Sequence, residues 1–344
     1  MNQSLFFGGA AVLLALLGGC GPEGTASSSG SLPSLGGSTA GATKAGSTPS
    51  TQQSASPTLS ATGTQATASA KAAVRFDGFA TPESAIYDAS NDRYLVSNVN
   101  GKPVEADNNG FISTLAPDGK VAALKWNEGG KGKTSLNAPK GLTIAQSILY
   151  VADIDHVRMF DLKTGGSLGE VKIEGATFLN DIVAAADGSV YVSDSGLKME
   201  GSDFAPSGTD AVYKIVAGKS EPVAKTADLG RPNGLALVQD TLLVVTFGSG
   251  ALYELDKNGQ KQGEQKLPKG GLDGLLLVED AILVTSWDGE CVYRAERNLD
   301  GKGFAFVPLL EGLSAPADIG YDSKRKRLIV PRFTSNAVET YDLP

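Results

Sequence analysis

Oxygen-bearing side chains recur in short turn motifs along the larger, C-terminal part of this 344-residue sequence. The motifs read PES, FLND, RPNG and LDG, and each sets one polar residue just before an apolar run. Those residues are Glu83, Asn180, Asn233 and Asp273. Carboxylate and amide oxygens are the ligands that hard divalent cations prefer, so the set suits Ca²⁺ first, with Mg²⁺, Mn²⁺ or Zn²⁺ as alternatives.

The same motifs have a simpler explanation as turns. Asn-Gly, Asn-Asp and Asp-Gly are common turn dipeptides, because Asn and Asp tolerate left-handed backbone conformations and bond their own backbone. Any one of Asn180, Asn233 and Asp273 is therefore more readily explained as a turn residue than as a ligand. Glu83 is not favoured in turns, and four oxygen donors in one register favour a shared metal site.

The motifs belong to a repeat. Each unit has an opening turn with a short apolar run, then a second and a third β-rich run, and five of the units also have an outer strand. The spacing of roughly 40 to 57 residues is typical of propeller blades. The six opening turns begin at Thr81, Ala138, Phe178, Arg231, Gly271 and Ala315.

The sixth unit ends at Pro344 without an outer strand of its own. The segment VRFDGFA, from Val74 to Ala80, precedes the first unit and can supply that strand. The sequence therefore predicts an all-β, six-bladed propeller over residues 73–344, closed by an N-terminal strand that serves as the outer strand of the last blade.

In a propeller, the loops that enter the innermost strands meet around the central channel. The four oxygen donors occupy one equivalent position of their opening turns, which we call the slot. Lys140 and Ala317 occupy the slot in the second and sixth units, so they should converge on the channel with the four oxygen donors. Lys140 is a catalytic candidate, because an ammonium group there would polarise a carbonyl or hold a carboxylate or phosphate. It is equally well explained as a structural counterion to Asp153, Asp155 or Asp181.

Loops between second and third strands should form a rim on the same face. Their polar and aromatic residues are Asn98, Asn100, Asp153, Asp155, Asp194, Phe247, Trp287 and Arg332. Asp153, Asp155, Trp287 and Arg332 are predicted to contact substrate, together with Asn180. Two of these loops, residues 98–109 and 195–210, are long enough to act as lids.

The Glu, Asn, Asn, Asp order of these motifs resembles the senescence marker protein/gluconolactonase/luciferin-regenerating family and the related diisopropyl fluorophosphatases. The resemblance spans about Val74 to Pro344 and implies a six-bladed propeller with one divalent cation in its channel. It implies that Glu83, Asn233 and Asp273 are metal ligands, that Asn180 is a ligand or substrate contact, and that Asp273 is the base or water-positioning carboxylate. The sequence departs from the family in two places: PES replaces the Glu-Gly-Pro of the lactonases, and Lys140 fills a slot that is expected to be uncharged. These departures bear on the activity more than on the fold.

The N-terminal segment predicts a different role. Residues 1–20 resemble a bacterial lipoprotein signal peptide whose lipobox ends at Cys20, the predicted acylation site; an ordinary signal peptide with an incidental cysteine is the alternative. Residues 21–72, rich in Ser, Thr, Gly and Ala, are expected to form a disordered tether. We therefore expect a protein anchored by lipid in the cell envelope, at an outer membrane and facing the periplasm.

Composition excludes several functions. The formal charge is −8 and no basic run occurs, so nucleic acid is not an expected partner. The single histidine, His156, cannot make a histidine-rich zinc site. Two readings remain: a monomeric metal-dependent hydrolase of a lactone or small ester, or a non-catalytic propeller with NHL-like repeats that binds a ligand or protein. The sequence leaves open whether the chain is an enzyme.

Overall fold

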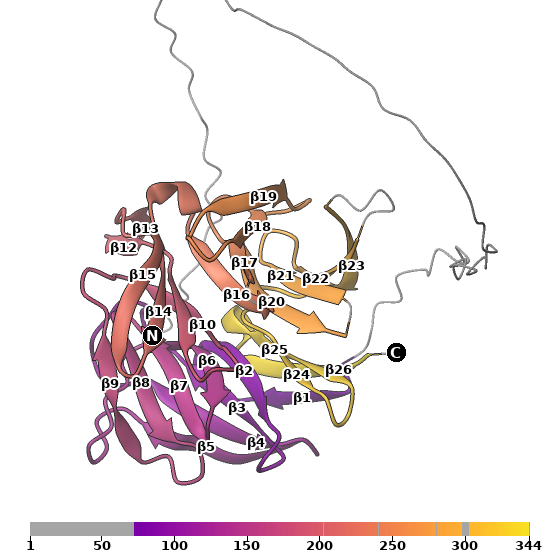
Figure 1. The fold of residues 1–344 in the computed structure, drawn as a ribbon. Coiled ribbons are helices and arrows are strands. Elements are labelled where there is room, and N and C mark those ends of the chain that lie inside the picture. The colour runs from indigo at the N-terminus through magenta and orange to yellow at the C-terminus, as the bar shows by residue number, and fades with distance from the viewer. Residues whose placement is uncertain (1–71, 202, 240, 280, 298–302, 344) are drawn as a thin grey trace, which may run out of the picture. The chain divides into compact units, whose positions relative to one another are not determined.

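The computed structural model describes residues 72–343 except 202, 240, 280 and 298–302. Within this part of the chain, six four-stranded antiparallel sheets are arranged as blades around a central channel (Figure 1). The predicted all-β, six-bladed propeller is therefore confirmed. The predicted signal peptide, Cys20 and tether lie outside the described residues. No helix in the described ranges is long and apolar enough to cross a membrane.

Each blade runs from an innermost strand at the channel to an outermost strand at the rim. Blade 1 contains β2 (Pro82–Asp88), β3 (Arg93–Asn98), β4 (Phe111–Ala116) and β5 (Lys120–Glu128). Blade 2 contains β6 (Pro139–Ala145), β7 (Ile148–Asp153), β8 (His156–Asp161) and β9 (Ser167–Lys172). Blade 3 contains β10 (Leu179–Ala184), β11 (Val190–Asp194), β14 (Ala211–Val216) and β15 (Lys219–Lys225).

The remaining blades follow the same order. Blade 4 contains β16 (Pro232–Val238), β17 (Thr241–Thr246), β18 (Ala251–Leu255) and β19 (Lys261–Lys266). Blade 5 contains β20 (Leu272–Val278), β21 (Ala281–Ser286), β22 (Cys291–Arg297) and β23 (Phe304–Glu311). Blade 6 contains β24 (Gly320–Asp322), β25 (Arg327–Arg332), β26 (Ala337–Asp342) and β1 (Val74–Asp77). An extra hairpin, β12 (Leu197–Glu200) and β13 (Asp203–Pro206), occupies the predicted long loop of blade 3.

The ring is closed by the N-terminal strand, as predicted. β1 pairs with β26 from Val74 opposite Thr340 to Asp77 opposite Ala337, so the last strand of the chain is not left as an open edge. Phe76 is 2% exposed and packs against the edge of the Tyr94 ring in blade 1. Closure therefore joins the two ends of the propeller by backbone hydrogen bonds and by buried apolar contacts.

The hydrophobic core is divided among the blades. Among the described residues, six clusters of buried side chains lie between neighbouring sheets, one at each blade-to-blade interface. A single blade buries neither of its faces alone, so each sheet depends on both neighbours for its stability. This packing fixes the inner ends of the blades around the channel, where the candidate site lies.

Candidate metal site at the head of the channel

A β-bulge recurs at the start of the innermost strands. In blades 1 to 5 the pairing with the second strand skips the same two residues, for example between Pro82 and Ala85 and between Leu272 and Leu275. The first skipped residue is the predicted slot residue in every case. A bulge redirects side chains locally, so it supplies the physical reason why this position differs from the rest of the strand.

Glycine follows the slot residue in three blades, and close packing of the inner strands requires it. A Cβ atom on Gly234 would lie 2.3 Å from the carbonyl oxygen of Asp273, and one on Gly141 would lie 2.6 Å from that of Asn180. The missing side chain lets the backbone of the next blade approach closely. The Asn-Gly and Asp-Gly pairs thus reflect packing between blades as well as turn formation.

The slot side chains are almost fully buried. Exposure is 6% for Glu83, 5% for Asn180, 2% for Asn233 and 3% for Asp273. One oxygen each of Glu83 (Oε2), Asn180 (Oδ1) and Asn233 (Oδ1) is buried and has no hydrogen-bond partner. Leaving a buried polar atom unpaired costs on the order of 1–3 kcal/mol, so three such oxygens at equivalent positions require an explanation.

The Asp273 carboxylate is held on both sides. Asn233 Nδ2 donates to its Oδ1 at 3.2 Å, and Trp287 Nε1 donates to its Oδ2 at 2.7 Å. Asn180 Nδ2 similarly donates to Ser195 Oγ at 3.1 Å. Both amide groups therefore use their NH₂ for a structural contact and leave the carbonyl oxygen free, which is the orientation a cation ligand needs.

The electrostatics of this set favour an added positive charge. Burial, followed by the negative charge of Asp318, raises the pKa of Asp273 to about 8. Burial and the nearby carboxylates, Asp273 first, raise the pKa of Glu83 well above its usual range. Desolvation and like charge both disfavour the ionised carboxylates, and a bound cation would reverse both effects.

The residues present fit a divalent cation of the oxygen-preferring kind. Within the described ranges no group of three or more His, Cys, Asp and Glu side chains is placed to hold a metal ion. The candidate set is instead mixed, with two carboxylates and two amides, which is a ligand combination for Ca²⁺ or Mg²⁺. The three unpaired oxygens and the raised carboxyl pKa values support it.

Lys140 lies in the same ring and is 1% exposed. Its Nζ donates to Ala138 O at 3.0 Å and lies 4.4 Å from the centre of the Phe178 ring. Among the described residues it forms no direct ion pair with Asp153, Asp155 or Asp181, although the negative charges of Asp153 and Asp194 act on it from a greater distance. Burial lowers its pKa to about 8, against the opposing effect of Glu83.

Lys140 and a bound cation would repel each other. Lys140→Met removes the charge while keeping an unbranched side chain, and it should tighten Ca²⁺ binding about tenfold, because a like charge in a partly desolvated site is worth more than 1 kcal/mol. Calorimetric titration of the full chain with Ca²⁺ measures this. Lys257→Met, on an exposed turn, is the matched control and should leave the affinity unchanged. Equal or weaker binding by Lys140→Met would contradict the placement of the cation beside Lys140.

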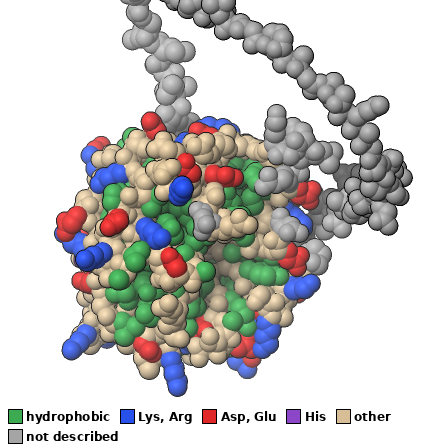
Figure 2. Space-filling model, viewed as in Figure 1, with side chains coloured by type: hydrophobic (Ala, Val, Ile, Leu, Met, Phe, Trp, Pro, Cys, Tyr) green, Lys and Arg blue, Asp and Glu red, His purple; other side chains and the backbone are tan. Residues whose placement is uncertain are grey.

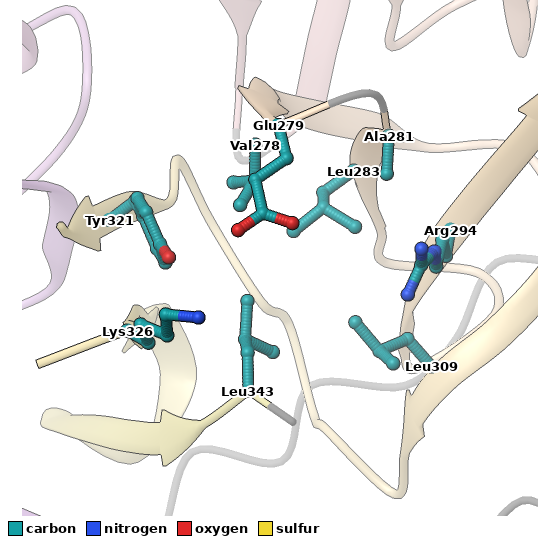
Figure 3. A pocket seen from close by; sticks show the side chains of 9 residues that line it. All are labelled: Val278, Glu279, Ala281, Leu283, Arg294, Leu309, Tyr321, Lys326 and Leu343. Atoms are coloured by element: carbon teal, nitrogen blue, oxygen red, sulfur yellow. The ribbon is translucent and has the colours of Figure 1, made fainter.

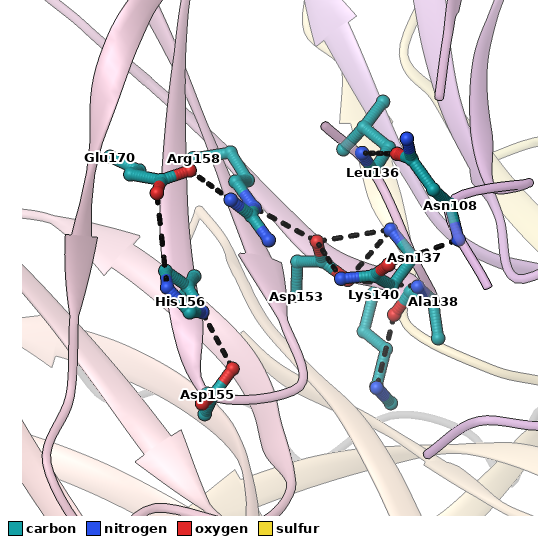
Figure 4. A network of polar contacts seen from close by, with 10 residues as sticks. All are labelled: Asn108, Leu136, Asn137, Ala138, Lys140, Asp153, Asp155, His156, Arg158 and Glu170. Atoms are coloured by element: carbon teal, nitrogen blue, oxygen red, sulfur yellow. Dashed lines mark hydrogen bonds and ion pairs between the residues drawn. The ribbon is translucent and has the colours of Figure 1, made fainter. Parts of the chain in front are cut away.

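Several predicted rim residues are structural instead. Asp153 is fully buried and accepts from the backbone N–H of Asn137 and Ala138, at 3.1 and 2.8 Å, and from Arg158 Nε at 2.9 Å (Figure 4). Asp194 in the same position of blade 3 accepts from Phe178 N at 2.9 Å. The last residue of the second strand thus accepts hydrogen bonds from the turn that opens its own blade and holds that turn in place. The prediction that Asp153 contacts substrate is not supported.

Asp155 and Arg332 are also engaged in local contacts. Asp155 Oδ1 lies 2.6 Å from His156 Nδ1, beside the Arg158–Glu170 pair (Figure 4). Arg332 is 8% exposed and pairs with Glu339 at 2.5 Å. Asp155 remains half-buried near the rim, whereas Arg332 serves the packing of blade 6.

Three aromatic rings pack together beside Asp273. The ring of Trp287 packs against Phe247 at 5.6 Å and against Phe333 at 5.3 Å between centroids. All three follow directly after the second strand of their blades, in blades 4, 5 and 6. Trp287 and Phe247 were predicted from the sequence as rim residues, together with Arg332 in blade 6. Phe333, one residue later and at the position equivalent to Trp287, was not predicted, although its alignment with the other two aromatic residues was a usable signal.

The β12–β13 hairpin contributes a second aromatic contact. Phe204, which is 48% exposed, packs edge-on against Phe178 at 5.7 Å, and Phe178 in turn covers the Lys140 ammonium. Within the predicted lid at residues 195–210, β12 and β13 therefore pair as a hairpin, and Phe204 of β13 contacts the aromatic residue that covers Lys140. Neither Phe178 nor Phe204 was predicted from the sequence as a site residue, because a single aromatic residue in a loop carries no periodic signal.

A small crevice between blades 5 and 6 lies apart from the slot residues (Figure 3). Its volume is about 50 Å³, and Glu279, Arg294 and Lys326 line it together with apolar side chains. This volume holds a water molecule or two but is far below the several hundred Å³ of ordinary ligand sites.

Fold and site together define a six-bladed propeller with a ring of buried oxygen donors in its channel. No protein-family model and no curated protein sequence matches the chain. Among solved structures, a protein assigned as a gluconolactonase is 18% identical, with a TM-score of 0.55 over 77% of this chain and 90% of its own. A calcium-binding regucalcin from Agrobacterium tumefaciens is 16% identical, with a TM-score of 0.51 over the same shares. A streptogramin B lyase is 12% identical, with a TM-score of 0.54 over 77% of this chain and 96% of its own. At these identities the likeness establishes the shared fold.

Proposed function

We propose that this protein is a metal-dependent hydrolase of a lactone or small ester, with one divalent cation, Ca²⁺ in the first instance, at the head of its channel. The single observation that carries the proposal is the set of unpaired, buried oxygens on Glu83, Asn180 and Asn233 next to the Asp273 carboxylate. The fold shared with a protein assigned as a gluconolactonase and with a calcium-binding regucalcin supports it.

Glu83, Asn180, Asn233 and Asp273 would hold the cation. When bound, it supplies Lewis-acid polarisation of the substrate carbonyl. Asp273 is the candidate base: with Trp287 and Asn233 fixing its orientation, it takes a proton from the attacking water. The water oxygen bonds to the carbonyl carbon, the ester C–O bond breaks, and the proton passes to the leaving alkoxide.

Lys140 would orient the acyl group. A lysine ammonium carries three N–H bonds, and among the described residues it donates to one acceptor, Ala138 O. The other two are available to a carbonyl oxygen or to the carboxylate that hydrolysis produces. Trp287, Phe247 and Phe333 would exclude water from one side of the substrate and supply apolar contact.

The proposed setting is the bacterial cell envelope. A lipid on Cys20 and a tether over residues 21–72 would hold residues 73–344 near a membrane, as a monomer facing the periplasm. Metabolic labelling with an azido fatty acid tests the anchor: the wild-type chain should be labelled, and Cys20→Ala should not be.

Turnover of a lactone and ester panel by the full chain tests the chemistry. Hydrolysis should be abolished by a chelator and restored by Ca²⁺ or Mg²⁺. Saturable binding of panel compounds without turnover would replace the hydrolase with a ligand-binding propeller of the NHL-like kind. Turnover that persists unchanged in the chelator would contradict the metal-dependent mechanism.

A further inference from the structure

The β12–β13 hairpin presents an apolar face beside the candidate site (Figure 1). Residues that pair across two antiparallel strands share a face of the sheet, and so do alternate residues along one strand. By this rule one face of the hairpin carries four apolar side chains, Leu197, Met199, Phe204 and Pro206. The opposite face carries charged side chains, among them Lys198 and Glu200, which pair at 2.8 Å. The hairpin is therefore amphipathic, as antiparallel strands are when only one face meets water alone.

The base of the hairpin is fixed to the opening turn of blade 3. Thr177 Oγ1 lies 2.7 Å from Ser207 Oγ and 2.8 Å from Thr209 Oγ1, where the chain returns from β13 to the blade. Phe178 follows Thr177 directly in the chain, and its ring covers the Lys140 ammonium at 4.4 Å. These contacts hold the apolar face of the hairpin next to the group that is proposed to orient the acyl part of the substrate.

Phe204 is only partly covered on this face. Its ring packs against Phe178 at 5.7 Å between centroids, yet Phe204 remains 48% exposed. Every other aromatic side chain in the described ranges is buried or half-buried. Figure 2 shows hydrophobic side chains gathered around a hollow near the middle of the face in view, and charged side chains spread over its outer parts.

The exposed ring is not an isolated surface residue. Met199 and Pro206 extend its face of the hairpin, and Phe178 adjoins it toward Lys140. A contiguous apolar surface with a polar rim marks a place where a ligand binds, whereas single exposed apolar residues do not. Apolar surface in contact with water gains about 25 cal/mol for each Å² that a ligand covers.

The position of this surface indicates which part of a substrate it contacts. Trp287 donates to Asp273, the candidate base, and belongs to the aromatic group of blades 4 to 6. Phe178 and Phe204 belong to blade 3 and lie on the side of Lys140. Because Lys140 is proposed to orient the acyl group, the hairpin is placed for the acyl part of the substrate rather than for the leaving group.

We propose that Phe204 is a specificity-determining residue, and that the preferred substrates are esters or lactones whose acyl part carries an aryl group. The inference rests on the proposed hydrolase function for its chemistry. The acyl carbonyl, and later the product carboxylate, lies at Lys140, and the aryl group lies against Phe204 and Met199. This contact is the same in the substrate and in the transition state, so it lowers KM without raising kcat.

Equilibrium dialysis of the full chain in Ca²⁺, with 4-phenylbutanoate as the probe, tests the subsite without turnover. This carboxylate is the acid that the predicted class of ester releases. It should bind saturably, and butanoate, which lacks the ring, should bind at least about tenfold more weakly. Phe204→Ser should weaken the binding of 4-phenylbutanoate about tenfold and that of butanoate less than about twofold.

Initial rates on the ethyl esters of the same two acids test the specificity. Phe204→Ser should raise KM for ethyl 4-phenylbutanoate about tenfold, with kcat nearly unchanged, and should alter KM for ethyl butanoate less than about twofold. Leu168→Ser is the matched control, because Leu168 is 53% exposed on β9 of blade 2, and it should behave as the wild type does. Melting temperatures check that both variants fold.

The two measurements separate this inference from the proposed function. If no ester or lactone is hydrolysed but the binding of 4-phenylbutanoate depends on Phe204, the hydrolase proposal fails and the aryl subsite stands. If the esters are hydrolysed but a folded Phe204→Ser chain binds and hydrolyses the phenyl compounds as the wild type does, the subsite is wrong and the hydrolase proposal stands. An absence of saturable 4-phenylbutanoate binding, or equal binding of butanoate by the wild type, also overturns the inference.

Discussion

Asp273→Asn should lower kcat for lactone or ester hydrolysis by about 10²–10⁴-fold, the usual contribution of a positioned general base. The amide keeps the shape of the side chain and still accepts one hydrogen bond, from Asn233 or Trp287. It cannot accept a proton from water, and it removes one negative charge from the cation site. The measurement is the initial rate on the best substrate of the panel, at saturating Ca²⁺.

The control for this prediction is Asp118→Asn, which makes the same change at an exposed turn and should leave kcat unchanged. Circular dichroism and the melting temperature check that both variants fold. If a folded, metal-loaded Asp273→Asn protein hydrolyses the substrate at the wild-type rate, another group is the base.

Without divalent metal, the full chain should become less stable as the pH rises from 5 to 8, with the melting temperature falling by several degrees. Burial raises the pKa of Asp273 to about 8 and of Asp318 to about 7, from ordinary values of 3.8. Between these limits the folded chain binds more protons than the unfolded chain. The stability present below pH 3.8 is therefore lost as the pH rises through 7 and 8.

Lys140 acts in the opposite direction at higher pH. Its pKa is lowered from 10.5 to about 8, so the folded chain binds fewer protons than the unfolded chain between these values, and stability rises with pH there. We therefore expect a minimum of the melting temperature near pH 8 in EDTA. Ca²⁺ should restore the stability at pH 8 by binding the ionised carboxylates.

Thermal melts at pH 5, 7, 8 and 9.5, with EDTA and with Ca²⁺, measure this profile. Asp273→Asn should flatten the fall between pH 5 and 8, because the substituted amide does not titrate. A wild-type profile in EDTA that is flat or rises from pH 5 to 8 would contradict the account of buried, mutually repelling carboxyl groups.

The sequence predicts the fold well because the repeat is strong. Each blade is marked by an opening turn and by β-rich runs. The sixth unit ends without an outer strand of its own, which indicates Val74–Asp77 as the closing strand. Convergence of the slot positions follows from the symmetry of a propeller. The bulge that orients Glu83 and its equivalents has no signature of its own beyond the glycine that follows in three blades.

The rim was less predictable, because the direction of a side chain at a strand end depends on local hydrogen bonding. Asp153 was expected to face substrate, yet it turns inward to accept two backbone N–H groups. Asp318 carried no sequence signal, since it follows the one slot filled by alanine. Its importance appears only when blade 6 meets blade 1 and Ser84 donates to it.

The metal content of the purified full chain tests the central claim most directly. Elemental analysis after dialysis against Ca²⁺, and then against metal-free buffer, should find about one ion per chain, as for a site with buried oxygen ligands. Glu83→Gln should hold none, and Asp118→Asn should match the wild type. A wild-type chain that retains no ion, or a Glu83→Gln chain that retains as much as the wild type, would contradict the assignment of the channel as a cation site.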